Sequence, residues 1–153
     1  MSTDAHGTQA VQRVAALAGE RLDPVLRELG REFITLYLED CDPVDLTRRS
    51  AADLYGAALS HWNFARKREP GQTRVRVFNP SIEEHGWQST HTIIEIVNDD
   101  MPFLVDSVTM EVNRHGLTLH LIVHPIVAVL RGADGALVDV APEDLQKARR
   151  ESF

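Results

Sequence analysis

The sequence of 153 residues has little of several features that define familiar protein classes. No apolar run approaches the roughly 20 residues that a transmembrane helix needs, so we expect no membrane span. The first ten residues, MSTDAHGTQA, lack the basic and apolar regions of a signal peptide, which predicts a cytoplasmic protein. The single cysteine, Cys41, excludes an internal disulfide and has no cysteine neighbours with which to form a zinc site.

Basic residues and glycine motifs are scarce as well. Sixteen Lys and Arg against 23 Asp and Glu give a formal net charge of −7. Because affinity for nucleic acid depends on basic residues that neutralise phosphates, we expect no nucleic-acid partner. The nine glycines form neither the Gly-x-Gly pair of a dinucleotide-binding turn nor a Walker loop. We therefore expect no cofactor in this chain.

Two regions of different periodicity meet at Pro70-Gly71. Residues 1–70 carry apolar side chains at helical spacing, and we interpret them as a helical lead-in in which Gly30 ends one helix. The clearest helix follows Ser50, which can cap the first turn together with Asp53.

After Gly71, apolar and polar residues alternate, which is typical of strands. The pattern predicts a helix over residues 102–115 and strands over 73–78, 90–98, 117–123, 126–131 and 136–140. This order predicts an α+β fold, with helices on one face of an antiparallel sheet and two domains, 1–70 and 71–153.

The junction between the second strand and the helix is the main candidate binding site. A strand that leads into a helix N-terminus leaves free backbone amides that can receive a carboxylate. Asp99 and Asp100 could instead occupy those amides and make a self-capped turn without a ligand. The predicted ligand- or partner-binding residues are Asn98, Asp99, Asp100, Met101, Pro102 and Phe103.

A second candidate surface lies on the predicted strand that follows the helix. Alternation places four residues on one strand face as interface candidates: Thr118, His120, Ile122 and His124. His120 and His124 would lie about 13 Å apart on such a strand, too far for one ion, and no metal is expected.

Catalytic motifs are missing from the sequence. Neither Ser60-His61 nor Asp106-Ser107 has the setting of a nucleophilic triad, and no Gly-x-Ser-x-Gly elbow occurs. We therefore expect no catalytic residue in this chain.

Several motifs together resemble the N-terminal region of the large bacterial NAD-specific glutamate dehydrogenases. The resemblance covers nearly the whole chain from about residue 30. The motifs are Ala52–Ala58, Ser60–Trp62, Arg76–Pro80, Glu84–Trp87, Asp100–Val108 and His124-Pro125.

The resemblance implies a helical lead-in and an ACT-like, ferredoxin-like domain, many hundreds of residues ahead of a catalytic domain. ACT-like domains bind amino acids or mediate subunit contacts at the strand–helix corner, where Pro-Gly is usual; this sequence has Pro102-Phe103 instead. The ACT pattern is βαββαβ, and residues 141–153 are too few for its last helix and strand. We therefore expect a domain truncated at the C-terminus, with Glu151–Phe153 beginning the next strand.

By resemblance, the chain is a non-catalytic regulatory or assembly module. The parent enzyme would use NAD to deaminate L-glutamate oxidatively to 2-oxoglutarate. The expected partners are the remainder of that enzyme, further copies of the chain in a homo-oligomer, and an amino-acid effector. The alternative is a pure protein–protein interaction module that binds no small molecule.

Overall fold

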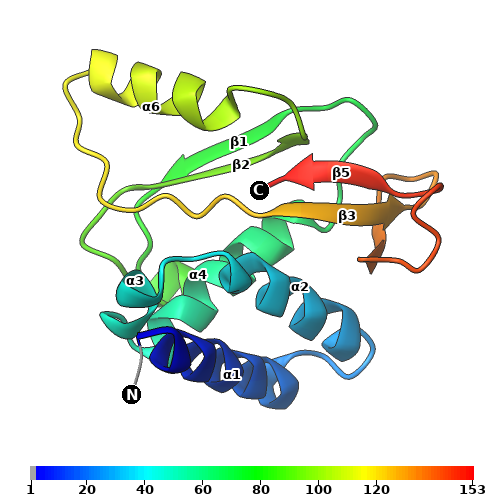
Figure 1. The fold of residues 1–153 in the computed structure, drawn as a ribbon, viewed down its shortest axis with the longest axis horizontal. Helices are drawn as coiled ribbons and strands as arrows, with labels where there is room; N and C mark the ends of the chain where they lie inside the picture. Colours follow the sequence, from blue (N-terminus) through cyan, green and yellow to red (C-terminus); the bar gives the residue numbers. More distant parts are fainter. Residues whose placement is uncertain (1–2) are drawn as a thin grey trace.

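The computed structural model describes residues 3–153, which form a helical layer and a five-stranded antiparallel sheet (Figure 1). The α+β class is thus confirmed. The helices are α1 (Thr3–Arg21), α2 (Arg27–Glu39), α3 (Pro43–Thr47), α4 (Ala51–Ala65), α5 (Ile82–His85) and α6 (Leu104–Arg114). The strands are β1 (Arg74–Phe78), β2 (Ile93–Asp99), β3 (Ile126–Arg131), β4 (Leu137–Val140) and β5 (Arg149–Ser152).

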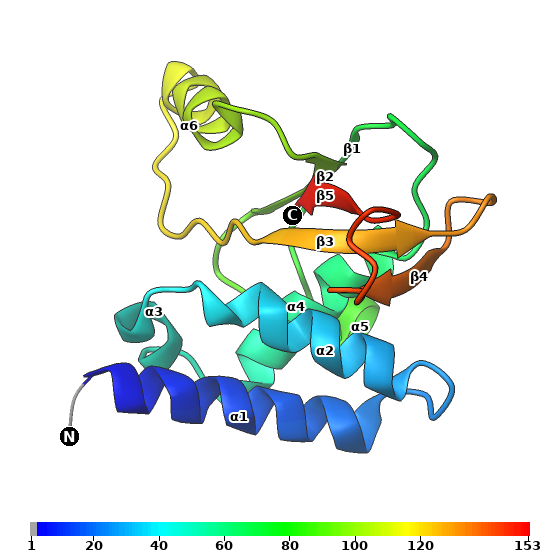
Figure 2. The ribbon, with the colours of Figure 1, turned by 45° about the vertical axis from the view of Figure 1, so that its right-hand side comes forward.

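The sheet lies between two unequal helical layers. Figures 1 and 2 show α1, α2 and α4 on one side of the sheet and α6 on the other. The prediction that the helices share one face is therefore wrong. The reason is that α2 and α4, which contact β4 and β2, already cover that face.

The strand order is β1-β2-β5-β3-β4, so the last strand in the sequence lies in the middle of the sheet. The prediction that a strand starts at Glu151–Phe153 is right only in part: Glu151 and Ser152 pair with both β2 and β3, but β5 begins at Arg149 and ends before Phe153. Side chains alternate along β2: Glu95 and Val97 are buried, whereas Ile94 is 41% exposed on the opposite face.

One hydrophobic cluster joins the lead-in to the sheet. The ring of Phe33 on α2 lies 5.2 Å from that of Trp62 on α4 and 5.1 Å from that of Phe153, after β5. Val97 and Val129 complete this region from the sheet and are almost fully buried. Both sides of residue 70 thus contribute to the same core, and the division into two domains stays a prediction.

Helix α4 begins as the sequence predicts. The Asp53 amide donates to Ser50 Oγ over 3.1 Å, and the Ser50 hydroxyl donates to Asp53 Oδ2 over 2.7 Å. This reciprocal cap satisfies one of the free amides of the first turn. Farther along, Gly56 lies under Trp87, where an added Cβ would be 2.5 Å from the Trp87 Cβ.

Two local predictions are wrong. Gly30 does not end a helix but is buried within α2, where an added Cβ would lie 2.7 Å from Leu22 Cδ1. It lets Leu22, directly after α1, pack closely against α2. Residues 117–123 form no strand, because β5 occupies the place beside β2 and this alternating segment pairs with no other described strand. None of the described helices is long and apolar enough to cross a membrane.

Candidate functional site

The corner between β2 and α6 contains a groove of about 420 Å³. Four of the six predicted binding residues line it, together with residues from α6 and from the segment leading into β3. The lining residues are Asp100, Met101, Pro102, Phe103, Leu104, Val105, Asp106, His124 and Ile126.

Phe103 sits at this corner in a backbone conformation that favours glycine. Its φ of 66° and ψ of 16° place it in the left-handed region, directly before α6. For a side chain with a Cβ this conformation costs roughly 1–2 kcal/mol. The Phe103 ring is 75% exposed, and it therefore gains little from burial in return.

The N-terminus of α6 has no side-chain cap. The suggestion that Asp99 and Asp100 cap it is wrong, because both carboxylates have other partners. Asp99 Oδ1 lies 2.9 Å from an Arg68 guanidinium nitrogen, and Asp100 accepts a hydrogen bond from Ser152 over 3.1 Å. The first-turn amides of α6 therefore remain available beside the groove.

Asn98, the first predicted site residue, has a structural role. It is buried in β2, where its Oδ1 accepts a hydrogen bond from Thr73 over 2.7 Å. Its side-chain amide donates to the Asp99 carbonyl over 3.1 Å. Neither Asn98 nor Asp99 lines the groove.

His124 joins the groove instead of an interface strand. Its Nε2 is buried and has no hydrogen-bond partner among the described residues. A buried nitrogen without a partner loses its hydration, so a ligand atom that bonds to it would restore a favourable interaction. The groove thus offers a small ligand free amides, this nitrogen and apolar side chains, beside the carboxylates of Asp100 and Asp106.

The other interface candidates do not share a strand face with His124. Thr118, His120 and Ile122 are exposed on the irregular segment that connects α6 to β3. The buried Pro125, directly before β3, was the sequence signal that the strand is interrupted there, because proline cannot donate a ladder hydrogen bond.

Histidine contacts offer no metal centre. His120 contacts His91, with ring centroids 4.3 Å apart and the rings tilted by 54°, a contact that strand spacing did not predict. Within residues 3–153, no group of three or more His, Cys, Asp or Glu side chains could hold a metal ion. Burial raises the pKa of the Cys41 thiol to about 11, which keeps it protonated and unreactive at neutral pH.

The residues present do not fit a dinucleotide cradle. Such a cradle needs glycines where a strand turns into a helix, so that the backbone can approach the pyrophosphate. The turn from β2 to α6 reads Asp100-Met101-Pro102-Phe103, and the turn from β1 to α5 reads Asn79-Pro80-Ser81. Neither turn contains a glycine, so neither gives a pyrophosphate the close approach to the backbone that it needs.

Comparison with known families agrees with this architecture. A family model described as "Glutamate dehydrogenase, ACT1 domain" matches residues 33–153. The chain belongs to this family. The match includes the β2–α6 corner and all five strands of the ACT1 domain, while α1 lies outside it.

Two relatives of the ACT1 domain are much longer proteins. This chain is 52% identical over 101 residues to the NAD-specific glutamate dehydrogenase of Halomonas elongata, and the match covers 65% of this chain and 6% of that protein. It is 40% identical over 128 residues to the NAD-specific glutamate dehydrogenase of Pseudomonas aeruginosa, and that match covers 84% of this chain and 8% of the relative. The matches thus span less than a tenth of these relatives. No solved structure matches the chain.

Proposed function

We propose that this chain is a non-catalytic N-terminal regulatory and assembly module of an NAD-dependent glutamate dehydrogenase in the cytoplasm. The parent enzyme would deaminate L-glutamate oxidatively to 2-oxoglutarate, with NAD bound by a domain outside these residues. The observation that carries the proposal is the β2–α6 groove in a chain of the ACT1 family. The groove combines uncapped helix amides with the unpartnered Nε2 of His124.

The regulatory role predicts that the groove binds an amino acid. The α-carboxylate would accept hydrogen bonds from the α6 amides, and the side chain of the effector would contact Met101 and Ile126. Calorimetric titration with the common L-amino acids tests this. We expect saturable heat with at least one of them, and a several-fold weaker affinity in His124→Ala.

His115→Ala serves as the matched control, because His115 lies at the other end of α6 and is exposed. We expect it to leave the affinity unchanged. Absence of both heat and thermal shift with every amino acid would contradict the regulatory version and leave the assembly version.

The assembly role is favoured by apolar side chains that the chain does not cover. Val75 and Val77 on the edge strand β1 are 57% and 61% exposed, and Ile94, which pairs with Val77 from β2, is 41% exposed. Exposed apolar side chains that gather on one region mark sites of protein–protein contact. The partners would be the remainder of the dehydrogenase or further copies of this chain.

Sedimentation over a range of concentrations tests assembly between copies. We expect oligomers that dissociate more readily in Val77→Asp and Ile122→Asp, and that are unaffected in Val25→Asp, where the valine is 90% exposed between α1 and α2. A monomer at all concentrations would restrict the partner to the rest of the enzyme.

The non-catalytic assignment has its own test. Purified chain incubated with glutamate and NAD should give no increase in absorbance at the NADH band. Formation of NADH without any added subunit would overturn the assignment.

A further inference from the structure

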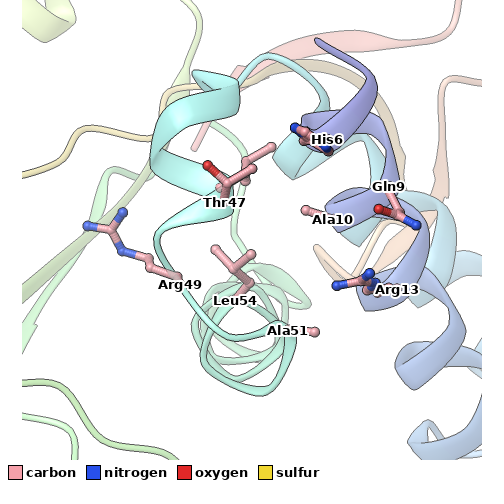
Figure 3. A pocket seen from close by; sticks show the side chains of 9 residues that line it. His6, Gln9, Ala10, Arg13, Thr47, Arg49, Ala51 and Leu54 are labelled. Carbon is pink, nitrogen blue, oxygen red and sulfur yellow. The ribbon is translucent and has the colours of Figure 1, made fainter. Parts of the chain in front are cut away.

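A second cavity, of about 370 Å³, lies between α1, α3 and the start of α4 (Figure 3). It shares no residue with the β2–α6 groove, and the proposed function does not use it. Its α1 wall precedes residue 33, where the family match begins. The lining residues are His6, Gln9, Ala10, Arg13, Leu46, Thr47, Arg49, Ala51 and Leu54.

The spacing of the walls is fixed by a glycine contact. Gly7 on α1 is buried against Pro43 at the start of α3, and an added Cβ would lie 2.8 Å from the Pro43 Cβ. Glycine is among the poorest helix formers, so its place within α1 needs a packing reason. This close approach supplies the reason, because any larger residue would push α1 away from α3.

The charge of the lining has one sign. Its ionisable residues are His6, Arg13 and Arg49, and no carboxylate is among the lining residues that the structure describes. In the part of the chain that the structure describes, the side chains of His6, Gln9 and Arg13 form no hydrogen bond or ion pair. These donors on α1 are therefore available to a ligand, in a chain whose net charge is −7.

The two arginines differ in direction. Figure 3 shows the Arg13 side chain reaching from α1 toward Ala51, whereas the Arg49 guanidinium extends to the other side of the α3–α4 connection. There Arg49 donates to the Asp45 carbonyl over 3.0 Å, and the same nitrogen lies 3.8 Å from the Asp45 carboxylate. Arg13 is thus the guanidinium that can meet a ligand in the cavity.

The rest of the lining is apolar and small. Ala10, Leu46, Ala51 and Leu54 surround the space that the polar side chains border. A ligand that fits both the polar and the apolar part of the lining has one anionic group and a short hydrocarbon body. The cavity volume is at the lower end of the range for small-molecule sites.

We propose that this cavity binds a small organic anion, a carboxylate or a phosphate ester, whose charged group is held by Arg13 and whose hydrocarbon part contacts Leu46 and Leu54. A guanidinium binds both kinds of oxyanion through paired N–H donors. His6 and Gln9 provide further donors from the same face of α1.

Titration of the ¹⁵N-labelled chain by NMR tests the proposal with three probes of similar size: butyrate, butyl phosphate and the neutral butyramide. We expect saturable amide shifts in residues 6–13 and 46–54 with the two anions and none with butyramide. Tighter binding of butyrate would indicate a carboxylate as the natural ligand, and tighter binding of butyl phosphate a phosphate ester.

Two arginine variants locate the binding group. Arg13→Gln should weaken binding of the anions at least about tenfold, because a hydrogen bond to a charged group is lost. Arg49 lines the same cavity, and Arg49→Gln leaves Arg13 in place. This variant should therefore change the affinity for the anions less than about twofold. The absence of saturable shifts with both anions would overturn the proposal. Equal binding of butyramide, or unchanged affinity in Arg13→Gln, would do the same.

Discussion

His61 lies in the core between α4 and the sheet, and both of its ring nitrogens have partners. Nε2 lies 2.9 Å from the Ile96 carbonyl oxygen and Nδ1 lies 3.0 Å from the Tyr37 hydroxyl. A carbonyl can only accept, so Nε2 carries the proton. In the neutral ring, Nδ1 is then the acceptor of a hydrogen bond from the Tyr37 hydroxyl.

This arrangement makes stability depend on pH. Burial is the largest cause that lowers the pKa of His61 below its ordinary value of 6.5, against an opposing effect of Glu95. Below pH 6.5 the unfolded chain binds a proton that the folded chain does not. The free energy of unfolding should therefore fall as pH decreases from 7 to 5.5, by at most about 1.4 kcal/mol per pH unit from this residue.

Urea denaturation at several pH values measures this dependence. His61→Gln should lower stability at pH 7 and flatten the slope between pH 6.5 and 5.5. An unchanged slope in the variant would assign the dependence to other groups.

Phe103 is the second residue whose local state can be tested alone. Phe103→Gly removes the cost of holding a residue with a Cβ in the left-handed backbone conformation. It should raise the free energy of unfolding by about 1 kcal/mol, after allowance for the greater freedom of glycine in the unfolded chain. Phe103→Ala removes the same exposed ring but keeps the strained backbone, so it should not stabilise. Chemical denaturation of both variants compares them, and equal stabilities would refute strain as the cause.

At the scale of elements, α1 contains two glycines in opposite surroundings. Gly7 is packed against Pro43, whereas an added Cβ at Gly19 would meet no atom within 4 Å. Gly19→Ala should therefore stabilise the fold by roughly 0.5–1 kcal/mol through helix propensity. Gly7→Ala should destabilise it despite the same gain, because α1 must shift from α3. Thermal melts of the two variants measure these changes. A higher melting temperature in Gly7→Ala would contradict the close contact between Gly7 and Pro43.

The predictions of helices and strands were right where a local sequence signal was enough. β1, β2, β3, β4, α4 and α6 all overlap segments that periodicity and capping residues predict. The segment 117–123 failed because alternation shows only that a strand is possible. Whether it forms depends on a free neighbour in the sheet, and β5 occupies the place next to β2.

At the scale of the whole molecule, β5 joins the parts through a buried carboxylate. Glu151 is 1% exposed and accepts hydrogen bonds from Arg68, in the connection after α4, and from Arg131 on β3. Each of the three donor–acceptor distances is 2.8 Å. Removing one partner of a buried ion pair leaves uncompensated charge in the interior.

Glu151→Gln should therefore lower the free energy of unfolding by about 3 kcal/mol or more. Glu111→Gln is the matched control, because Glu111 pairs with Arg114 on the exposed side of α6 and should cause no measurable change. Guanidinium denaturation of the two variants measures the difference. Equal stabilities would show that the buried cluster contributes little.

The sequence by itself determined the local structure of this protein. The change of period at Pro70-Gly71 and the Ser50–Asp53 cap act through neighbours a few residues away, and the family motifs are contiguous. Only the tertiary structure decided that β5 lies at the centre, that α6 lies opposite the lead-in, and that His124 joins the corner groove. Arg68, at the end of a basic run, shows the physical reason: it is buried because Glu151, 83 residues away, compensates its charge. Contacts of that span leave no periodic pattern in the sequence.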